Sequence, residues 1–444
     1  MSNKEIDKQY ASLTKDLIKT LSSDGKLAVV QAPPGSGKTY MLLAVVSELV
    51  KQGKRVALAA QTNRQADDIA FRWHRDYRDL LAERLGSSAS QAPLGFPTSV
   101  AWRTSPLDLT AGPGLFISTS AKWTTVKDPE PFDLLAVDEA WQMAWGDLMQ
   151  CANLSKKFFM IGDPGQIAPV VTIDVRRWAT APRPPHKPAP EVVLDDPDLR
   201  NTAFIGSLPA CRRLPHESDE YVKPFYDFDF AAYASPGERS LSISNSKAEP
   251  QLEKLVNLLN SGQPVLATIP TPEEGLAPEV DKDIAVQVER IVRTLLTGRS
   301  EMVVEPGESP RSVRTGDIGV CATHRSMNGE LRKALGAEFS DVTIDTPERW
   351  QGLERPIMIV VHPLSSVIEP SAFDLETGRL CVMASRHQVG LIIVARDHVG
   401  ETLEAFIPEA AQAPGQPDVV GRGHFAHARF WNALAQDDRI VALT

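Results

Sequence analysis

QAPPGSGKT, residues 31–39, separates a short apolar run, LAVV at 27–30, from residues 39–50, where apolar residues recur at helical spacing. A glycine-rich loop between a buried strand and a helix turns its backbone N–H groups inward, and the helix N-terminus adds the positive end of its dipole. Lys38 supplies a point charge for β- and γ-phosphates, and the Thr39 hydroxyl is a ligand for Mg²⁺. The sequence therefore predicts a nucleotide site formed by Gln31, Ala32, Pro33, Pro34, Gly35, Ser36, Gly37, Lys38 and Thr39.

A second motif, DLLAVDEA at 133–140, places two carboxylates directly after an apolar strand. Asp138 is expected to hold Mg²⁺, directly or through water, and Glu139 to orient and deprotonate the water that attacks a γ-phosphate. A third, GDPGQIAPV at 162–170, follows an apolar run and presents Gln166 as a sensor of the γ-phosphate. An acidic helix cap and a plain Asp-Pro-Gly turn are the alternative interpretations of these two segments.

The composition is that of a globular protein with 444 residues, of which 42% are hydrophobic, enough for two or three domains. Four widely separated cysteines form no disulfide or metal-binding pattern. The polar N-terminus and the lack of an 18-residue apolar run predict a cytoplasmic protein without membrane insertion. The net charge of −10 leaves a local basic groove possible.

Strand-like runs alternate with helical stretches along the whole chain, which is typical of doubly wound parallel sheets in an α/β fold. The expected strands are residues 27–30, 56–60, 115–118, 134–137 and 158–161, and then 265–269, 318–322, 342–344, 357–361 and 391–394. A Pro-rich stretch at 179–198 is expected to be an irregular connection. We therefore predict two domains, 1–205 and 206–444, with a small insertion at 75–113 in the first and a loop at 297–316 in the second.

The order of these motifs resembles that of superfamily 1 helicases and translocases, closest to the Upf-like and RecD-like branch. The first half supplies counterparts of motifs I, Ia, II and III, namely QAPPGSGKT, Gln61-Thr62-Asn63, VDEA and GDPGQIAPV, and FISTSAK at 116–122 is similar to the segment before motif II. This resemblance implies two tandem RecA-like P-loop NTPase domains with an interdomain ATP cleft.

The second half continues the resemblance in order. LPACRRLP at 208–215 resembles motif IV, with Arg213 at the arginine position and Arg212 where the family usually has a Tyr that stacks on adenine; the choice between the two arginines stays open. TIDTPERWQGLE at 343–354 resembles motif V through Gly352 and Glu354. RLCVMASRH at 379–387 resembles motif VI, with Arg386 as the second arginine that stabilises the transferred phosphate.

The resemblance also implies that single-stranded DNA or RNA is bound by polar side chains, for which Thr62, Asn63, Thr119 and Thr346 are candidates. Trp350 is either a stacking surface for a base or a core residue. The segment FRWHRDYR at 71–78 interleaves aromatic residues with arginines and is either a second binding strip or an ordinary amphipathic helix.

The function expected from the resemblance is that of an ATP- and Mg²⁺-dependent translocase or helicase on a single nucleic-acid strand. A monomer and 5′→3′ movement are expected with it. The catalytic residues would be Lys38, Glu139, Gln166, Arg213 and Arg386. Two alternatives remain at this point. One is a nucleic-acid-stimulated ATPase that remodels protein–nucleic acid complexes without unwinding a duplex, and the other is an ATP-dependent switch that binds a protein partner.

Overall fold

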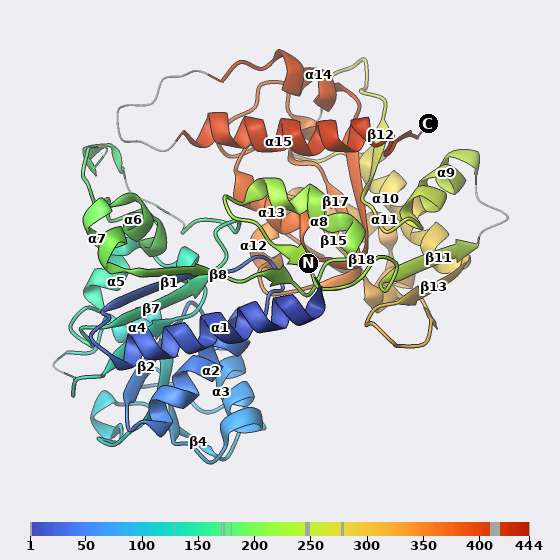
Figure 1. The fold of residues 1–444 in the computed structure, drawn as a ribbon. Coiled ribbons are helices and arrows are strands. Elements are labelled where there is room, and N and C mark those ends of the chain that lie inside the picture. Colours follow the sequence, from blue (N-terminus) through green and yellow to red (C-terminus); the bar gives the residue numbers. More distant parts are fainter. Residues whose placement is uncertain are drawn as a thin grey trace. The chain divides into compact units, whose positions relative to one another are not determined.

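The computed structural model describes residues 2–127, 129–169, 171, 174–178, 180–244, 249–276, 279–408 and 418–443. The chain forms two compact units, each built around its own sheet (Figure 1). The first consists mainly of Met1–Pro164 and Ala168–Pro209, and the second of Gly165–Ile167, Ala210–Gln412 and Pro417–Thr444. The division between them falls at Pro209.

The first unit is an α/β layer structure around a parallel sheet with the strand order β4-β3-β5-β2-β6-β7-β1-β8. Its strands are β1 (Leu27–Gln31), β2 (Arg55–Ala60), β3 (Ala82–Leu85), β4 (Val100–Arg103), β5 (Gly114–Thr119), β6 (Leu134–Val137), β7 (Phe158–Gly162) and β8 (Phe204–Ser207). The helices are α1 (Asn3–Ser22), α2 (Lys38–Lys51), α3 (Asn63–Tyr77), α4 (Ser120–Trp123), α5 (Trp145–Gln150), α6 (Ala189–Asp195) and α7 (Pro197–Thr202), with 3₁₀ turns η1 (Pro106–Asp108), η2 (Ala140–Gln142) and η3 (Arg176–Trp178).

Burial explains why the strands of this unit are continuous apolar runs. Every residue of β2 is buried, as expected for a central parallel strand with both faces covered. One face packs against the apolar sides of α1, α2 and α3, while Trp123, Leu135 and Met160 belong to a second buried cluster. The strands predicted for the first half of the chain are thereby confirmed.

The second unit is built on a parallel sheet with the order β16-β15-β17-β18-β12-β19. The strands of the whole unit, inside and outside this sheet, are β9 (Ala210–Cys211), β10 (Ala231–Ala232), β11 (Ser240–Ser244), β12 (Val265–Ile269), β13 (Arg299–Val303), β14 (Arg311–Ser312), β15 (Ile318–Cys321), β16 (Thr343–Asp345), β17 (Arg355–Val361), β18 (His387–Arg396) and β19 (Ile440–Ala442). The helices are α8 (Asp219–Val222), α9 (Pro250–Leu259), α10 (Lys282–Thr297), α11 (Arg325–Leu335), α12 (Pro347–Trp350), α13 (Thr377–Ala384), α14 (His398–Ala405) and α15 (Val419–Gln436), and the 3₁₀ turns are η4 (His216–Ser218), η5 (Lys223–Phe225), η6 (Thr315–Asp317), η7 (Ala337–Phe339) and η8 (Pro363–Ser366).

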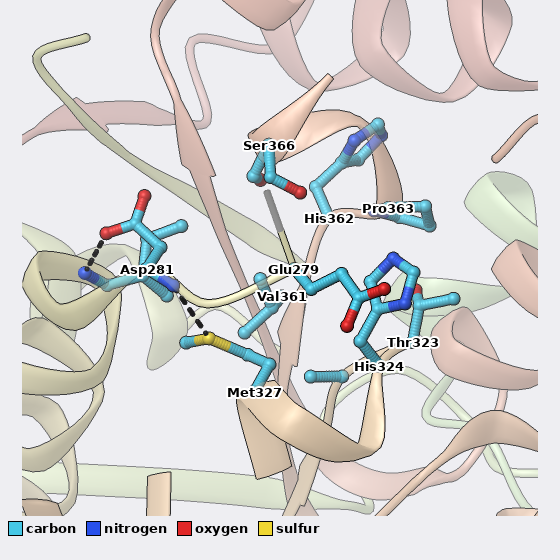
Figure 2. A pocket seen from close by; sticks show the side chains of 12 residues that line it. Glu279, Asp281, Thr323, His324, Met327, Val361, His362, Pro363 and Ser366 are labelled. Carbon is cyan, nitrogen blue, oxygen red and sulfur yellow. Dashed lines mark hydrogen bonds between the residues drawn. The ribbon is translucent and has the colours of Figure 1, made fainter. Parts of the chain in front are cut away.

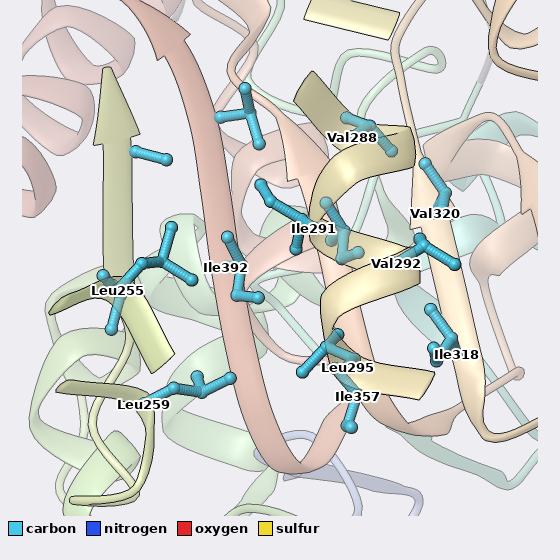
Figure 3. Packing of buried hydrophobic residues seen from close by; sticks show 14 of the residues in the cluster. Leu255, Leu259, Val288, Ile291, Val292, Leu295, Ile318, Val320, Ile357 and Ile392 are labelled. Atoms are coloured by element: carbon cyan, nitrogen blue, oxygen red, sulfur yellow. The ribbon is translucent and has the colours of Figure 1, made fainter. Parts of the chain in front are cut away.

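Helix α10 shows how the second sheet acquires its core. Val288, Ile291, Val292 and Leu295 recur at intervals of one helical turn, so they form one apolar face (Figure 3). This face packs into a buried cluster with residues of β15, β17 and β18, to which α9 also contributes. The second set of predicted strands and the α/β fold class with two parallel sheets are confirmed.

Two segments expected to be irregular, and the expected insertion at 75–113, contain regular structure. Residues 189–195 of the Pro-rich stretch form α6, because Pro190 lies in the first turn, where no intrahelical N–H donor is needed. Residues 297–316 contain strands β13 and β14, which pair antiparallel, so the expectation of a plain loop was wrong. Residues 75–113 supply β3 and β4, which extend the first sheet.

Candidate nucleotide-binding site

The loop at 31–39 connects β1 to α2 in the first unit, as its sequence predicts. Gly35 and Gly37 adopt φ angles of 62° and 81°, in the left-handed region that glycine favours, and Gly37 is the N-cap of α2. Ala32 is fully buried in the apolar core, and its N–H donates to the carbonyl of Gly162 at 2.9 Å. The methyl group of Ala32 therefore points into the protein interior, and alanine at this position leaves the loop intact.

The two acidic residues follow β6 and contact the two polar residues at the start of α2. The Thr39 hydroxyl donates to Asp138 Oδ2 at 3.1 Å, and Lys38 Nζ lies 3.0 Å from Glu139 Oε1. The N–H of Glu139 donates to Asp138 Oδ1 at 3.0 Å. The structure thus brings together the four residues that the sequence predicts for phosphate binding, metal binding and water activation.

Glu139 has an unusual backbone. Its φ and ψ angles are 51° and 45°, a left-handed conformation that costs free energy for a residue with a side chain. This conformation ends β6 sharply and begins η2, so the carboxylate reaches Lys38. The ammonium group of Lys38 is therefore paired with the predicted base itself.

Asp138 is buried, with 5% of its surface exposed. Burial, reinforced by the neighbouring Glu139 carboxylate, raises the pKa of Asp138 to about 6, against the opposing effects of Lys38 and Thr39. A carboxylate and a hydroxyl in contact are the hard oxygen ligands that suit Mg²⁺, which usually completes its shell with water and substrate phosphates. The donor set of Thr39 and Asp138 therefore fits the metal.

Gln61, at the end of β2, also reaches this site. Its Nε2 donates to the carbonyl of Asp138 at 3.3 Å, and its Oε1 accepts a hydrogen bond from the Ser120 hydroxyl at 3.1 Å. The sequence motif that contains Gln61 does not predict this role. The signal for it was topological, because β2, β5 and β6 are adjacent parallel strands whose carboxyl ends meet at one sheet edge.

The polar residues proposed for nucleic-acid contact in this unit hold local structure together. Thr62 is the N-cap of α3, where its hydroxyl accepts the N–H of Gln65 at 3.2 Å. The Asn63 side chain accepts a hydrogen bond from Arg84 at 2.9 Å. Thr119 caps α4 by accepting the N–H of Lys122. The geometry supplies a structural role for each of these residues, and their contact with a nucleic-acid strand stays a prediction.

The aromatic residues of the segment at 71–78 do not form one exposed strip. Trp73 is fully buried, whereas Phe71 is exposed on its outer side and contacts the ring of Phe96. Arg72 pairs with Asp68, and Arg75 pairs with Asp76. The amphipathic helix is therefore the interpretation that the structure supports.

In the second unit, Arg213 lies beside Glu354. Arg213 Nε donates to Glu354 Oε2 at 2.5 Å, and its Nη1 donates to the carbonyl of Ser385 at 3.1 Å. Burial alone would raise the pKa of Glu354, but Arg213, Arg386 and Arg239 together hold that pKa below its ordinary value. Motifs IV, V and VI, far apart in the sequence, thus converge on one carboxylate.

Arg213, Arg239, Arg386 and Glu354 form an arginine cluster. Arg386 is 1% exposed, and its neighbour His387 is fully buried. Burial lowers the pKa of His387 to about 3, with the positive charges of Arg213 and Arg239 acting in the same direction. His387 is therefore neutral at pH 7. Three guanidinium groups therefore act on the Glu354 carboxylate, and one of them, that of Arg239, also pairs with Glu305.

Arg212 and Gly352 have distinct local roles. The Arg212 guanidinium lies 3.9 Å from the centre of the Tyr233 ring, whereas Arg213 contacts Glu354 of motif V. Gly352 has a φ of 81°, so the turn before Glu354 requires glycine. Of the two neighbouring arginines, Arg213 is the one in the cluster.

The interpretation of Trp350 as an exposed stacking surface was wrong. Trp350 is fully buried, and its indole N–H donates to the carbonyl of Val320 at 3.1 Å. Gly319 leaves the space that the Trp350 ring fills, since any side chain there would collide with it. Thr346 is also buried, and its carbonyl accepts the N–H of Trp350 at the start of α12. Both residues hold motif V on the sheet, so neither is available at the surface.

Gln166 is buried, and its segment, Gly165–Ile167, is part of the second compact unit. Gly378, in α13, allows this close approach, because a Cβ atom there would collide with the backbone of Gln166. The role of Gln166 as a γ-phosphate sensor stays a prediction.

A separate pocket of the second unit lies where β15 and β17 end (Figure 2). Thr323 and His324 follow β15, and His362 follows β17. The acidic residues of its lining already have partners: both carboxylate oxygens of Asp281 accept hydrogen bonds from Arg396, and Glu279 accepts one from Ser326. No cluster of three or more metal-ligating side chains is found in the described ranges, at this pocket or elsewhere.

Among the helices that the structure describes, none has the length and apolarity to cross a bilayer.

Comparisons with known proteins agree on the general class. A family model described as an AAA domain matches residues 10–186. The DNA replication ATP-dependent helicase/nuclease DNA2 of Saccharomyces cerevisiae is 27% identical over 161 residues, which cover 34% of this chain and 10% of that protein. The chain thus matches about a tenth of the length of this curated relative.

Solved viral helicases are similar to this chain at low identity. An Arterivirus nonstructural protein 10 helicase is 14% identical with a TM-score of 0.44, covering 87% of this chain and 63% of that one. The same kind of protein in complex with DNA is 14% identical with a TM-score of 0.41, covering 85% and 62%. Because these scores are low, the fold described above rests on the sheets of this chain itself.

Proposed function

We propose that this chain is a motor that hydrolyses ATP and uses the cycle to move along single-stranded nucleic acid. The ordered motifs, together with the AAA domain that matches residues 10–186, place the chain among the superfamily 1 helicases. The observation that carries the proposal is the connected set of Lys38, Thr39, Asp138 and Glu139 around the glycine-rich loop. The name of the yeast relative, an ATP-dependent helicase/nuclease, supports it.

The proposed chemistry begins with an exchange of partners at Lys38. The β- and γ-phosphates of ATP replace Glu139 beside the ammonium group, so the Glu139 carboxylate becomes available to water. Glu139 accepts a proton as the water oxygen attacks the γ-phosphorus, and the bond to the bridging oxygen breaks to leave ADP. Mg²⁺ bound by Thr39 and Asp138 would neutralise charge on the phosphates.

The arginine cluster is proposed to stabilise the charge that spreads over the γ-phosphate oxygens in the transition state. Arg386 and Arg213 are the candidates, because they stand at the arginine positions of the segments that resemble motifs VI and IV and both act on Glu354. Arginines that act only in one state of the catalytic cycle would couple hydrolysis to movement, as the family resemblance implies.

The decisive test is ATP turnover with and without single-stranded DNA and RNA, combined with strand displacement from a partial duplex. Stimulated turnover with displacement supports a helicase, and stimulation without displacement supports a remodelling ATPase. Turnover that no strand stimulates, with no strand bound, contradicts the motor function and leaves the protein-binding switch. The Lys38→Ala variant is the control for contaminating ATPases, because it lacks the phosphate-binding charge.

A further inference from the structure

Arg239 is the arginine of the cluster that belongs to no helicase-like motif. It lies directly before β11, and 5% of its surface is exposed. Burying a guanidinium group costs free energy unless hydrogen bonds and opposite charge compensate for the lost hydration. The partners of Arg239 therefore indicate what this side chain does.

The guanidinium group of Arg239 holds the backbone of the two neighbouring arginines of motif IV. Its Nη1 donates to the carbonyl of Arg213, and its Nη2 donates to the carbonyl of Arg212 at 2.8 Å. Residues 212–215 lie between β9 and η4, outside the strands and helices that the structure describes, where a buried carbonyl needs a partner from elsewhere. A planar guanidinium bridges two successive carbonyls in a fixed geometry, which the single ammonium group of a lysine does not do.

The tip of the Arg213 side chain is held as well. It donates to Glu354 of motif V and to the carbonyl of Ser385 of motif VI. Arg239 thus fixes the backbone from which the Arg213 side chain extends, and the other two motifs fix its guanidinium group. A side chain held at both ends loses little conformational freedom when an anion binds to it.

Arg239 is itself attached to a firmly packed part of the second unit. Every residue of β11 pairs with β13, and Leu241 and Ile243 of β11 are buried in the core. Arg239 Nη2 also lies 3.2 Å from a carboxylate oxygen of Glu305, in the segment between β13 and β14. The small sheet β11-β13-β14 is therefore connected to motif IV through one side chain.

We propose that Arg239 is a positioning residue for ATP hydrolysis, which holds the backbone of Arg213 so that the Arg213 guanidinium meets the charge that develops on the γ-phosphate oxygens. This role rests on the proposed function, because it requires hydrolysis and the participation of Arg213. A displacement of about 1 Å in a catalytic group can cost about a hundredfold in rate, so a change at Arg239 should reach the chemistry through Arg213.

The test measures kcat for ATP, and the Kd of a non-hydrolysable ATP analogue, in Arg239→Lys, Arg213→Ala and the double variant. Lysine keeps the charge but does not bridge the two carbonyls, so Arg239→Lys should lower kcat by about 10–100-fold. The Kd should stay the same, because the loop of the first unit holds the phosphates. In the Arg213→Ala background, Arg239→Lys should lower kcat no further, because residues that act as a unit are not additive.

Arg439→Lys is the matched control. Arg439 is a buried arginine of the same unit, and it also donates to backbone carbonyls, those of Leu258, Gln263 and Pro264, which lie far from motif IV in the sequence. Chemical denaturation should show a loss of stability in both lysine variants, whereas kcat should fall only in Arg239→Lys. Arg239→Gln, a neutral side chain with an N–H donor, should also lower kcat and keeps the test independent of the folding of one variant.

An unchanged kcat in a folded Arg239 variant overturns the positioning role. Equal proportional losses of kcat with and without Arg213 also overturn it, because Arg239 would then act independently of Arg213. A fall of the same size in Arg439→Lys has the same consequence, since it would show a general loosening of the second unit. A wild-type protein that does not hydrolyse ATP contradicts the proposed function instead, so the two failures are distinguishable.

Discussion

The two units hold their charged residues in different ways. In the first, each group has an opposite partner: Lys38 contacts Glu139, and Asp138 accepts the Thr39 hydroxyl. In the second, Arg213, Arg239 and Arg386 all lower the pKa of one carboxylate, that of Glu354. In the first site Lys38 must exchange its carboxylate partner when a phosphate binds, whereas the second unit gathers three guanidinium groups around one carboxylate. A site of the first kind suits catalysis by a base, and one of the second kind suits stabilisation of an anion.

The largest effect is expected when one arginine is removed from the group around Glu354 in the second unit. Arg386→Ala should lower kcat for ATP by roughly a thousandfold, because an arginine that stabilises the transferring phosphoryl group contributes about that much or more. Steady-state ATP turnover measures it. Arg293→Ala, at an exposed arginine of α10 outside the motifs, is the control.

Because Arg386 is buried, Arg386→Lys serves as the second variant, since it keeps the charge and most of the volume. Circular dichroism establishes that both variants are folded. Folded variants with unchanged kcat would show that the cluster only holds the second unit together.

The corresponding test of the first unit is Glu139→Gln. A general base contributes about 10²–10⁴-fold, so kcat should fall by that factor. ATP binding should persist or tighten, because Lys38 loses the carboxylate that competes with the phosphates. Single-turnover kinetics separate the two effects, with Glu48→Gln, an exposed glutamate of α2, as the control. Normal hydrolysis by Glu139→Gln would disprove the assignment of the base.

Trp350 tests whether motif V acts through packing. Trp350→Ala should destabilise the second unit by about 3–5 kcal/mol, the usual cost of removing a fully buried aromatic side chain. Trp350→Phe, which retains most of the apolar volume, should cost less. Chemical denaturation measures the change in the free energy of unfolding. The affinity of the folded Trp350→Phe variant for single-stranded nucleic acid should equal that of the wild type. A large loss of strand affinity with unchanged stability would restore the stacking role.

Acid should act on the second unit, where His362, His387 and His427 are buried. Burial is the main cause that lowers the pKa of His387 and of His427 to about 3, and that of His362 well below its ordinary value. In the unfolded chain each pKa is near 6.5. Between pH 6.5 and 3 the unfolded state therefore binds protons that the folded state does not bind. The contribution of these histidines to stability is fully present above pH 6.5 and is lost as the pH falls towards 3.

The slope is about 1.4 kcal/mol per pH unit for each histidine. Denaturation of the wild type at pH 7.5 and pH 5.5, read by hydrogen exchange in β18, should show the loss, and His427→Gln should reduce it. Equal protection of β18 at both values would contradict the assignment of neutral buried histidines.

Sequence reasoning located the residues correctly where their positions follow from neighbouring strands. The loop at 31–39 and the pair Asp138 and Glu139 each follow a strand, and adjacent parallel strands bring their ends together without further information. It left Trp350 open between a stacking surface and a core residue, because the burial of this ring depends on the space that Gly319 leaves on β15. It also gave no role to Gln61, because a side chain that supports a backbone carbonyl has no motif of its own.

Thr62 gives the smallest expected effect and separates a helix cap from a ligand contact. Thr62→Ala removes the hydroxyl that caps α3 and should cost about 1 kcal/mol, visible as faster hydrogen exchange in the first turn of the helix. Thr62→Ser keeps the cap and should restore the protection. If Thr62 also contacts a strand, Thr62→Ala weakens strand binding more than ATP binding, while Thr62→Ser leaves both unchanged. Thr14→Ala, which removes a hydroxyl bonded within α1, controls for a general loosening of the unit. Strand affinity that is the same in all variants would leave the cap as the whole role of Thr62, and the first unit would then need other residues to bind nucleic acid.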